Sequence, residues 1–237
     1  MTSIVPEPAL RSFLEEATAR YEATLRSEAG MRAEEYLTSR GLSEDSVRSL
    51  RLGYVENPLP GHESAREYIS VPYLTRAGVT TVRFRRIGEG GGPKYRSVPG
   101  DPPRIFNANA LLIPSDHIAI CEGEFDAIAA QQAGIPAVGI AGVGCWNPYF
   151  ARCFKGYKAV FILADNDPLK KKRNCRECAD MGNAECLGHN VGCEFAEKIA
   201  PSINNARVSP MPEGHDVNSF LIEHGASALL ERLEIKK

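Results

Sequence analysis

Two stretches of this 237-residue chain decide its fold: HIAICEGEFDA at 117–127 and AVFILADND at 159–167. Each begins with a run of apolar residues and ends in acidic ones. A short apolar run bounded by polar residues is typical of a strand that is buried on both faces. A helical pattern over 125–133 follows the first run, and such alternation of strand and helix indicates a parallel sheet.

The pattern continues through the rest of the second half. We expect strands at 137–140 and 206–209 and helices at 194–200 and 217–233, with a helical segment also over 146–154. These elements predict an α/β domain over 114–237, in which helices flank a parallel sheet.

The first half has a different pattern. An amphipathic stretch over 7–27 predicts a helix, a shorter one follows over 31–39, and Ser43 is placed to cap a third. From Tyr68 the hydrophobic period changes to two, which predicts antiparallel strands on either side of a turn. Residues 1–113 are therefore expected to form a smaller α+β subdomain.

Composition limits the function classes. Hydrophobic residues make up 43% and charged residues 24%, which excludes wholesale disorder, and the net charge of -2 excludes a uniformly basic nucleic-acid coat. No apolar run reaches the length of a membrane helix, and the N-terminus has no signal-peptide pattern. We therefore expect a cytoplasmic protein with no membrane partner. Seven cysteines make a disulfide framework a poor interpretation.

Acidic residues follow three of the expected strands. In open α/β sheets, sites form beyond the carboxyl ends of strands. Asp165 and Asp167 are two residues apart, so in an extended backbone they project to one side, about 6–7 Å apart. Clustered carboxylates repel one another unless a cation neutralises them, and hard oxygen ligands favour Mg²⁺ or Mn²⁺. The alternative is that Asp126 and Asp216 only cap helices.

These acids carry a family resemblance. The segment 122–127 resembles the Glu-Gly-x-x-Asp-(Ala/Val) motif of Toprim domains, and 165–167 resembles their Asp-x-Asp motif. Further segments resemble the DnaG-type primase catalytic core found in bacteria and phages, and the likeness runs with gaps from about residue 30 to about residue 220. These segments are 36–43, 50–54, 86–88, 93–95 and 105–107.

The resemblance implies a Toprim-type sheet and a role for each matching acid. Glu122 would be the metal-linked or general acid/base glutamate, Asp165 and Asp167 would bind Mg²⁺, and all three would be catalytic. Asp126 would support the metal site, and Asp216 is a weaker match to the late Toprim acid.

The implied activity is that of a nucleotidyltransferase in DNA replication, which joins ribonucleoside triphosphates into short RNA primers on single-stranded DNA. The usual zinc-binding and helicase-interacting domains find no counterpart in the sequence. We therefore expect a stripped-down core of the kind that a phage or a mobile element encodes, located in the cytoplasm, which is the host's if a phage encodes the chain. A replicative helicase or a separate zinc-domain protein is then an expected partner.

The segment between Arg83 and Arg104 is locally basic, with six basic and two acidic residues, a net +4. A basic groove with an aromatic residue is a common way to hold single-stranded nucleic acid. The resemblance puts Arg86 and Lys94 where the family contacts template or nucleotide. The alternative is a sheet edge protected by charge. The expected nucleic-acid or nucleotide contacts are Arg83, Arg85, Arg86, Lys94, Tyr95 and Arg104.

A cysteine-rich segment follows Asp167, and 169–191 is interpreted as an insertion in the Toprim domain. Thiolate and imidazole ligands in tetrahedral geometry favour a structural Zn²⁺, which would fold such a polar loop. Four ligands are needed from five candidates, and a flexible loop with reduced thiols is the alternative. The candidates are Cys175, Cys178, Cys186, His189 and Cys193.

Two other functions share the same acids. A Toprim-family nuclease would cut DNA rather than extend a primer. A DNA-binding or recombination scaffold without catalytic activity would bind DNA but show no metal-dependent chemistry.

Overall fold

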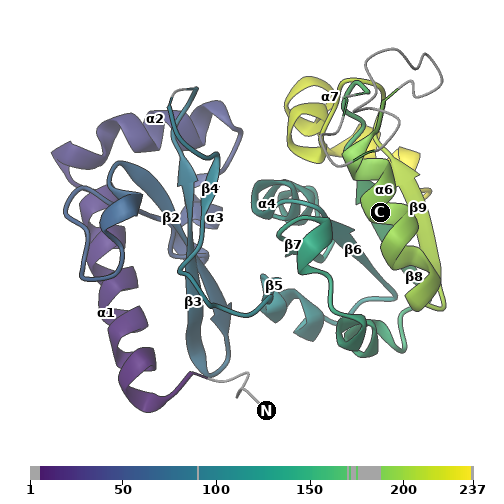
Figure 1. Cartoon of the computed structure of the whole chain (residues 1–237). Helices are drawn as coiled ribbons and strands as arrows, with labels where there is room; N and C mark the ends of the chain where they lie inside the picture. Colours follow the sequence, from purple (N-terminus) through teal and green to yellow (C-terminus); the bar gives the residue numbers. More distant parts are fainter. Residues whose placement is uncertain (1–5, 90, 170, 172–174, 176–187, 236–237) are drawn as a thin grey trace. The chain divides into compact units, whose positions relative to one another are not determined.

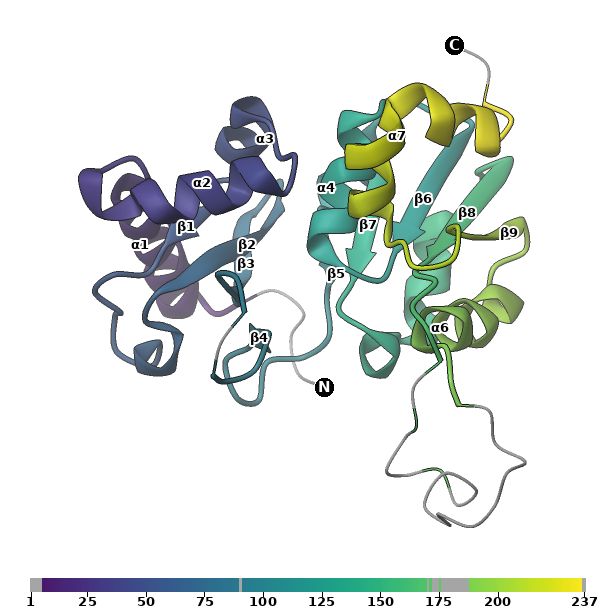
Figure 2. The ribbon, with the colours of Figure 1, turned by 90° about the horizontal axis from the view of Figure 1, so that it is seen from above.

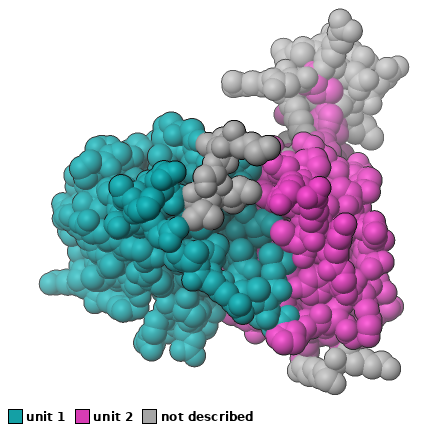
Figure 3. Space-filling model, turned by 90° about the horizontal axis from the view of Figure 1, so that it is seen from below, with its two compact units in different colours: residues 1–113 teal, residues 114–237 magenta. Residues whose placement is uncertain are grey.

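The structure is a computed structural model that describes residues 6–89, 91–169, 171, 175 and 188–235. The chain divides into two compact units, Met1–Ile113 and Pro114–Lys237, which are coloured separately in Figure 3. Within the described ranges, no helix is both long enough and apolar enough to cross a membrane.

The first unit is built on a four-stranded antiparallel sheet in the order β1-β2-β3-β4 (Figure 1). Its elements in chain order are α1 (Pro8–Leu25), η1 (Glu28–Gly30), α2 (Met31–Ser39), α3 (Glu44–Ser49), β1 (Gly53–Tyr54), η2 (Glu63–Ala65), β2 (Tyr68–Thr75), β3 (Gly78–Arg86), β4 (Tyr95–Arg96), β5 (Ile105–Phe106) and η3 (Ala108–Leu112).

Helix α1 packs on this sheet and closes a hydrophobic core. Tyr21 of α1 is buried with Val82 and Phe84 of β3. Gly53 allows β1 to approach the helix, because a Cβ at this position would lie 2.5 Å from the backbone carbon of Tyr21. The expected antiparallel strands and the cap at Ser43 are both confirmed, since Ser46 N–H donates to Ser43 Oγ.

The second unit is the expected α/β structure. Its elements are β6 (His117–Cys121), α4 (Glu124–Gln132), β7 (Ala137–Ile140), η4 (Val143–Cys145), η5 (Pro148–Phe154), β8 (Ala159–Ala164), α6 (Val191–Ile199), η6 (Ala200–Ser202), β9 (Ala206–Pro210) and α7 (Val217–Arg232).

Four strands of this unit are parallel and lie in the order β7-β6-β8-β9. The chain moves from β6 to β7 in one direction and from β8 to β9 in the other. Because such crossovers are right-handed, α4 and α6 cover opposite faces of the sheet, and α7 packs beside α4 (Figure 2). The direction reverses between β6 and β8, which makes their carboxyl ends the topological switch point.

Three elements differ from the sequence expectations. The segment expected to be helical over 146–154 is a 3₁₀ helix that starts at Pro148. Helix α6 begins at Val191, earlier than expected, because Asn190 caps it. Helix α7 is interrupted at Gly225, whose φ of 78° is outside the helical region.

Candidate active site at the ends of strands β6 and β8

The register of the parallel sheet brings two predicted acids to the switch point. Cys121 of β6 is paired with Leu163 of β8, so Glu122 lies level with Ala164, and Asp165 follows one residue later. Both carboxylates therefore leave the sheet at its carboxyl edge, on neighbouring strands. Sites in open α/β sheets form at this place.

Asp165 is the electrostatic centre of the acids. Its Oδ1 is fully buried and accepts no hydrogen bond within the described part of the chain. The pKa of Asp165 is raised to about 9, first by burial and then by the charges of the other four predicted acids, in the order Asp126, Glu122, Asp216 and Asp167. Carboxylates from three separate parts of the sequence thus act on one side chain.

Two of the acids also cap helix α7. Asn218 N–H donates to Asp126 Oδ1 over 3.0 Å, and Ser219 N–H donates to Asp216 Oδ1 over 2.6 Å. Asp126 lies in the first turn of α4 and is buried, whereas Asp216 is the N-cap of α7. Helix capping therefore accounts for one carboxylate oxygen of Asp126 and one of Asp216. Both also satisfy amides that would otherwise lack partners at a helix N-terminus.

Hydrogen bonds of Asn166 and Asn190 hold the loop that follows β8 in place, and the sequence analysis did not predict a role for either residue. Asn190 Nδ2 donates to Asn166 Oδ1 over 2.7 Å and to the carbonyl oxygen of Asp167 over 3.0 Å. Asn190 Oδ1 in turn accepts from Cys193 N–H, which makes it the N-cap of α6. The sequence contains a signal for this cap, because Asn190 stands three residues before Cys193, the spacing at which an N-cap side chain accepts from a backbone amide of the first turn. Asp167 itself is exposed, so its carboxylate is open to solvent.

Gly192 lets helix α6 approach the acidic strand end. A Cβ at Gly192 would lie 2.1 Å from the backbone oxygen of Asp165 and 2.7 Å from its nitrogen. Real Cβ atoms do not come so close to backbone atoms, so only glycine fits here. The position of Asp165 therefore depends on a residue 27 positions later in the chain.

The acid cluster fits a hard cation that is also held by its substrate. Among the described residues, the possible metal ligands that come together in a group of three, with ligand atoms within 4.8 Å of one another, are His215, Glu223 and His224. No three of the described acids around Asp165 bring their oxygens this close together. Mg²⁺ is usually bound by one or two carboxylates, together with waters and substrate phosphates. The buried Oδ1 of Asp165 and the mutual repulsion of the acids are the features that a bound cation would relieve.

The predicted zinc ligands are only partly described. Cys178 and Cys186 lie outside the described residues. Hydrogen bonds with Cys175 and Glu194 raise the pKa of His189, and its Nδ1 lies 2.7 Å from Glu194 Oε1. Cys193 lies in the first turn of α6, where burial raises the pKa of its thiol. The zinc site stays a prediction.

In the first unit, the predicted basic residues gather around Tyr95 of β4. The guanidinium carbons of Arg83 and Arg85 lie 5.1 and 5.2 Å from the centre of its ring, and Lys94 Nζ lies 5.8 Å away. Arg83 and Arg85 share a face of β3, as strand alternation predicts. Lys94 is exposed, and Tyr95 is half-buried.

Three of the predicted basic residues are held by the protein itself. Arg85 is buried, and its guanidinium donates to the hydroxyls of Tyr36 and Tyr95. The Arg104 side chain is 10% exposed and lies 3.5 Å from Asp101. Arg86 donates to the carbonyl oxygens of Gly88 and Gly92, so it shapes the turn before β4.

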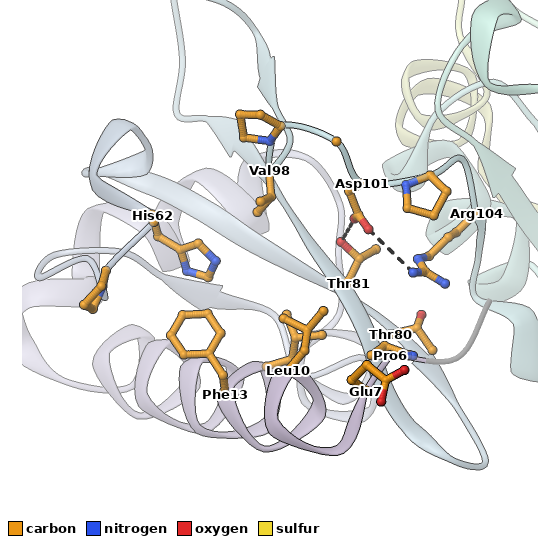
Figure 4. Close-up of a pocket in the computed structure, with 16 residues that line it drawn as sticks. Pro6, Glu7, Leu10, Phe13, His62, Thr80, Thr81, Val98, Asp101 and Arg104 are labelled. Carbon is orange, nitrogen blue, oxygen red and sulfur yellow. Dashed lines mark hydrogen bonds and ion pairs between the residues drawn. The ribbon is translucent and has the colours of Figure 1, made fainter. Parts of the chain in front are cut away.

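The first unit also contains a pocket of about 430 Å³ between α1, β3 and the segment 98–104 (Figure 4). Phe13 and the buried His62 line it, and Thr81 donates to Asp101 at its other wall. The Tyr21 hydroxyl lies 3.0 Å from His62 Nδ1, and burial lowers the pKa of His62. Of the predicted site residues, Arg104 lines this pocket.

No protein-family model matches the chain. It is 40% identical over 173 residues to the Gene 57 protein of Mycobacterium phage D29, an alignment that covers 71% of this chain and 99% of that protein. It is 24% identical to a DNA primase of Chlamydia pneumoniae, over 85% of this chain. The chain spans 37% of the length of that primase.

Solved structures share the fold. A DNA primase domain from Pseudomonas aeruginosa superposes with a TM-score of 0.71 at 22% identity, covering 95% of this chain and 78% of that one. The RNA polymerase domain of Mycobacterium tuberculosis primase DnaG gives 0.70 at 16% identity, covering 97% and 84%. A DnaG primase catalytic domain bound to single-stranded DNA gives 0.68 at 18% identity, covering 95% and 80%.

Proposed function

Because the chain belongs to the family of the Gene 57 protein of Mycobacterium phage D29 and has the fold of the DnaG-type primase catalytic core, we propose that it synthesises short RNA primers on single-stranded DNA. The observation that carries the proposal is the position of the acids. Charges from three parts of the sequence act on Asp165, at the switch point of the parallel sheet. That arrangement suits metal-dependent transfer of a nucleotidyl group.

The acids divide into two roles. Asp165 and Asp167, with Glu122, would hold divalent cations, Mg²⁺ or Mn²⁺, together with the phosphates of a ribonucleoside triphosphate. When bound, such cations stabilise the attacking and leaving oxygens of the transfer. Asp126 and Asp216 would act mainly by holding the first amides of α7, which keeps this helix start beside the site.

The cluster around Tyr95 is the proposed contact with single-stranded DNA. The ring of Tyr95 offers a stacking surface to a base, while Lys94 and Arg83 offer charge to the neighbouring phosphates. Arg85 would position Tyr95 rather than contact the nucleic acid, because its guanidinium is buried between two tyrosine hydroxyls. The likeness to a catalytic domain bound to single-stranded DNA supports single-stranded DNA as the ligand.

The test is primer synthesis by the purified chain on single-stranded DNA, with labelled ribonucleotides and Mg²⁺ or Mn²⁺. Asp165→Asn should abolish labelled oligoribonucleotides, whereas Glu231→Gln, an exposed acid on α7, should leave them unchanged. If the native chain makes no product, the reaction is repeated with the host's replicative helicase and zinc-domain protein. Equal synthesis by Asp165→Asn would refute the proposed site, and DNA cleavage without synthesis would favour a nuclease.

A further inference from the structure

A second group of metal-ligating side chains lies at the start of helix α7. The nearest ligand atoms of His215, Glu223 and His224 all lie within 4.8 Å of one another. His215 precedes the helix N-cap, and the other two come from its second turn, before the interruption at Gly225. This group is distinct from the acids around Asp165, and neither histidine has a part in the proposed primer synthesis.

His215 is oriented as a metal ligand would be. Its Nδ1 lies 3.2 Å from the carbonyl oxygen of Glu213, and its Nε2 lies 3.0 Å from Glu223 Oε2. Metal-binding histidines usually donate one ring N–H to a carbonyl or carboxylate, which leaves the other nitrogen for the metal. If Nδ1 carries the hydrogen, Nε2 and the carboxylate oxygen are two acceptors that face each other. A positive species between them, a proton or a metal ion, makes this contact favourable.

The second imidazole is held beside the first by an aromatic ring. The His224 ring lies 4.8 Å from that of Phe220, and the His215 ring lies 6.2 Å from it. The two imidazole centres are 5.7 Å apart, and His224 Nε2 is 3.7 Å from Glu223 Oε1. Phe220 thus lies near both rings, and both imidazole side chains stay partly exposed, His215 to 21% and His224 to 40%.

We propose that His215, Glu223 and His224 bind one Zn²⁺ ion or a similar divalent transition metal. Two imidazole nitrogens and one carboxylate are ligands that such metals accept, whereas Mg²⁺ prefers oxygen alone. Tetrahedral bonds of about 2.0–2.1 Å separate ligand atoms by about 3.3 Å. The His215–Glu223 pair, at 3.0 Å, is already this close, and the other pairs must close by at most about 1.5 Å. Glu223 and His224 are exposed and able to move by this amount. A solvent molecule would take the fourth position.

A metal ion at this site would act on the neighbouring acid. Asp216 follows His215 directly and caps α7 through Ser219. Metal binding would tie the loop before the helix to the second turn of α7. It would thereby fix the backbone on both sides of Asp216.

The test is zinc binding to the whole chain by calorimetry, in excess Mg²⁺ to occupy the acid cluster. The cysteine-rich segment is removed as a competitor by changing Cys175, Cys178, Cys186 and Cys193 to serine. This protein should bind one Zn²⁺, and its thermal unfolding temperature should rise. His224→Ala and Glu223→Gln should each weaken binding by about tenfold or more. His117→Ala, which alters a histidine outside the group, should bind zinc like its parent.

Two results would overturn the proposal. One is the absence of zinc binding in the folded serine background. The other is unchanged affinity in both His224→Ala and Glu223→Gln. If the serine background does not fold, the native chain is used, and both substitutions should then lower its zinc stoichiometry by one.

Discussion

Replacing Asp165 by asparagine should stabilise the metal-free protein while removing its response to Mg²⁺. The reason is that burial and repulsion among the carboxylates lower the stability of the folded state. Burial and four neighbouring acids raise the pKa of Asp165 from 3.8 to about 9, so at neutral pH the folded chain holds a proton that the unfolded chain has lost. Asparagine keeps a similar shape without a charge, so Asp165→Asn removes this cost.

The magnitude follows from linkage. At pH 7 the unfolded carboxyl is 3.2 pH units above its pKa of 3.8, which corresponds to about 4 kcal/mol at about 1.36 kcal/mol per unit. This is an upper value, because neighbouring acids share the proton. The sign is set by the raised pKa: the unfolded state binds fewer protons between pH 4 and pH 9. The stability of the native chain therefore falls as pH rises through this window, and the gain from Asp165→Asn grows.

Urea unfolding followed by the fluorescence of Trp146 measures this directly. Trp146 is the single tryptophan, and it is buried in the same unit as Asp165. In EDTA, the native chain and Asp165→Asn should have about equal free energies of unfolding near pH 4. At pH 7 the free energy of unfolding of the variant should be larger by about 2–4 kcal/mol. Mg²⁺ should stabilise the native chain, by about 2.7 kcal/mol at 100 times Kd, and should leave the variant unchanged.

The control is Glu231→Gln, which removes an exposed acid of α7 and should change neither curve. The reasoning would be refuted by a variant no more stable than the native chain at pH 8. A stability difference that does not vary with pH would refute it equally. Either result would mean that the acids do not repel one another in the folded chain.

Three further predictions concern single side chains. Gly192→Ala should destabilise the second unit by about 1–3 kcal/mol and weaken Mg²⁺ binding, as urea unfolding and calorimetry would show, because its Cβ would meet the Asp165 backbone. Asp126→Ala should cost about 1.5–3 kcal/mol in urea, whereas Asp167→Ala, at an exposed position, should stay within about 0.5 kcal/mol; equal losses would contradict the division of roles. Tyr95→Ala should weaken binding of single-stranded DNA by about 1–3 kcal/mol at all salt concentrations. Lys94→Ala should instead lower the salt dependence by about 0.7 in the logarithmic slope, and unchanged slopes in a fluorescence-anisotropy titration would oppose a phosphate contact.

The local structure of this protein can be predicted from its amino-acid sequence. Apolar runs that end in acids predicted strands β6 and β8, and the change of period at Tyr68 predicted the antiparallel sheet. Ser43 was recognised as a helix cap from its place before a helical pattern. These features depend on residues within about one or two turns of each other, so periodicity and capping chemistry are sufficient to find them.

Which residues meet at the site depends on how distant segments of the chain pack together. Strand order depends on pairing between segments far apart in the chain, and it is this order that puts Glu122 beside Asp165 at the switch point. The same holds for Gly192 against the Asp165 backbone and for Asp126 on an amide of α7, 92 residues away. No local pattern contains these contacts, because they arise only when separate elements pack together.

Burial was likewise a tertiary property. Arg83, Arg85 and Arg86 look alike in the sequence, as basic residues on one strand. Packing against Tyr36 and Tyr95 buries Arg85, and its guanidinium donates to both tyrosine hydroxyls. The environment of a charged side chain is set by the elements that cover it, and these come from other parts of the chain.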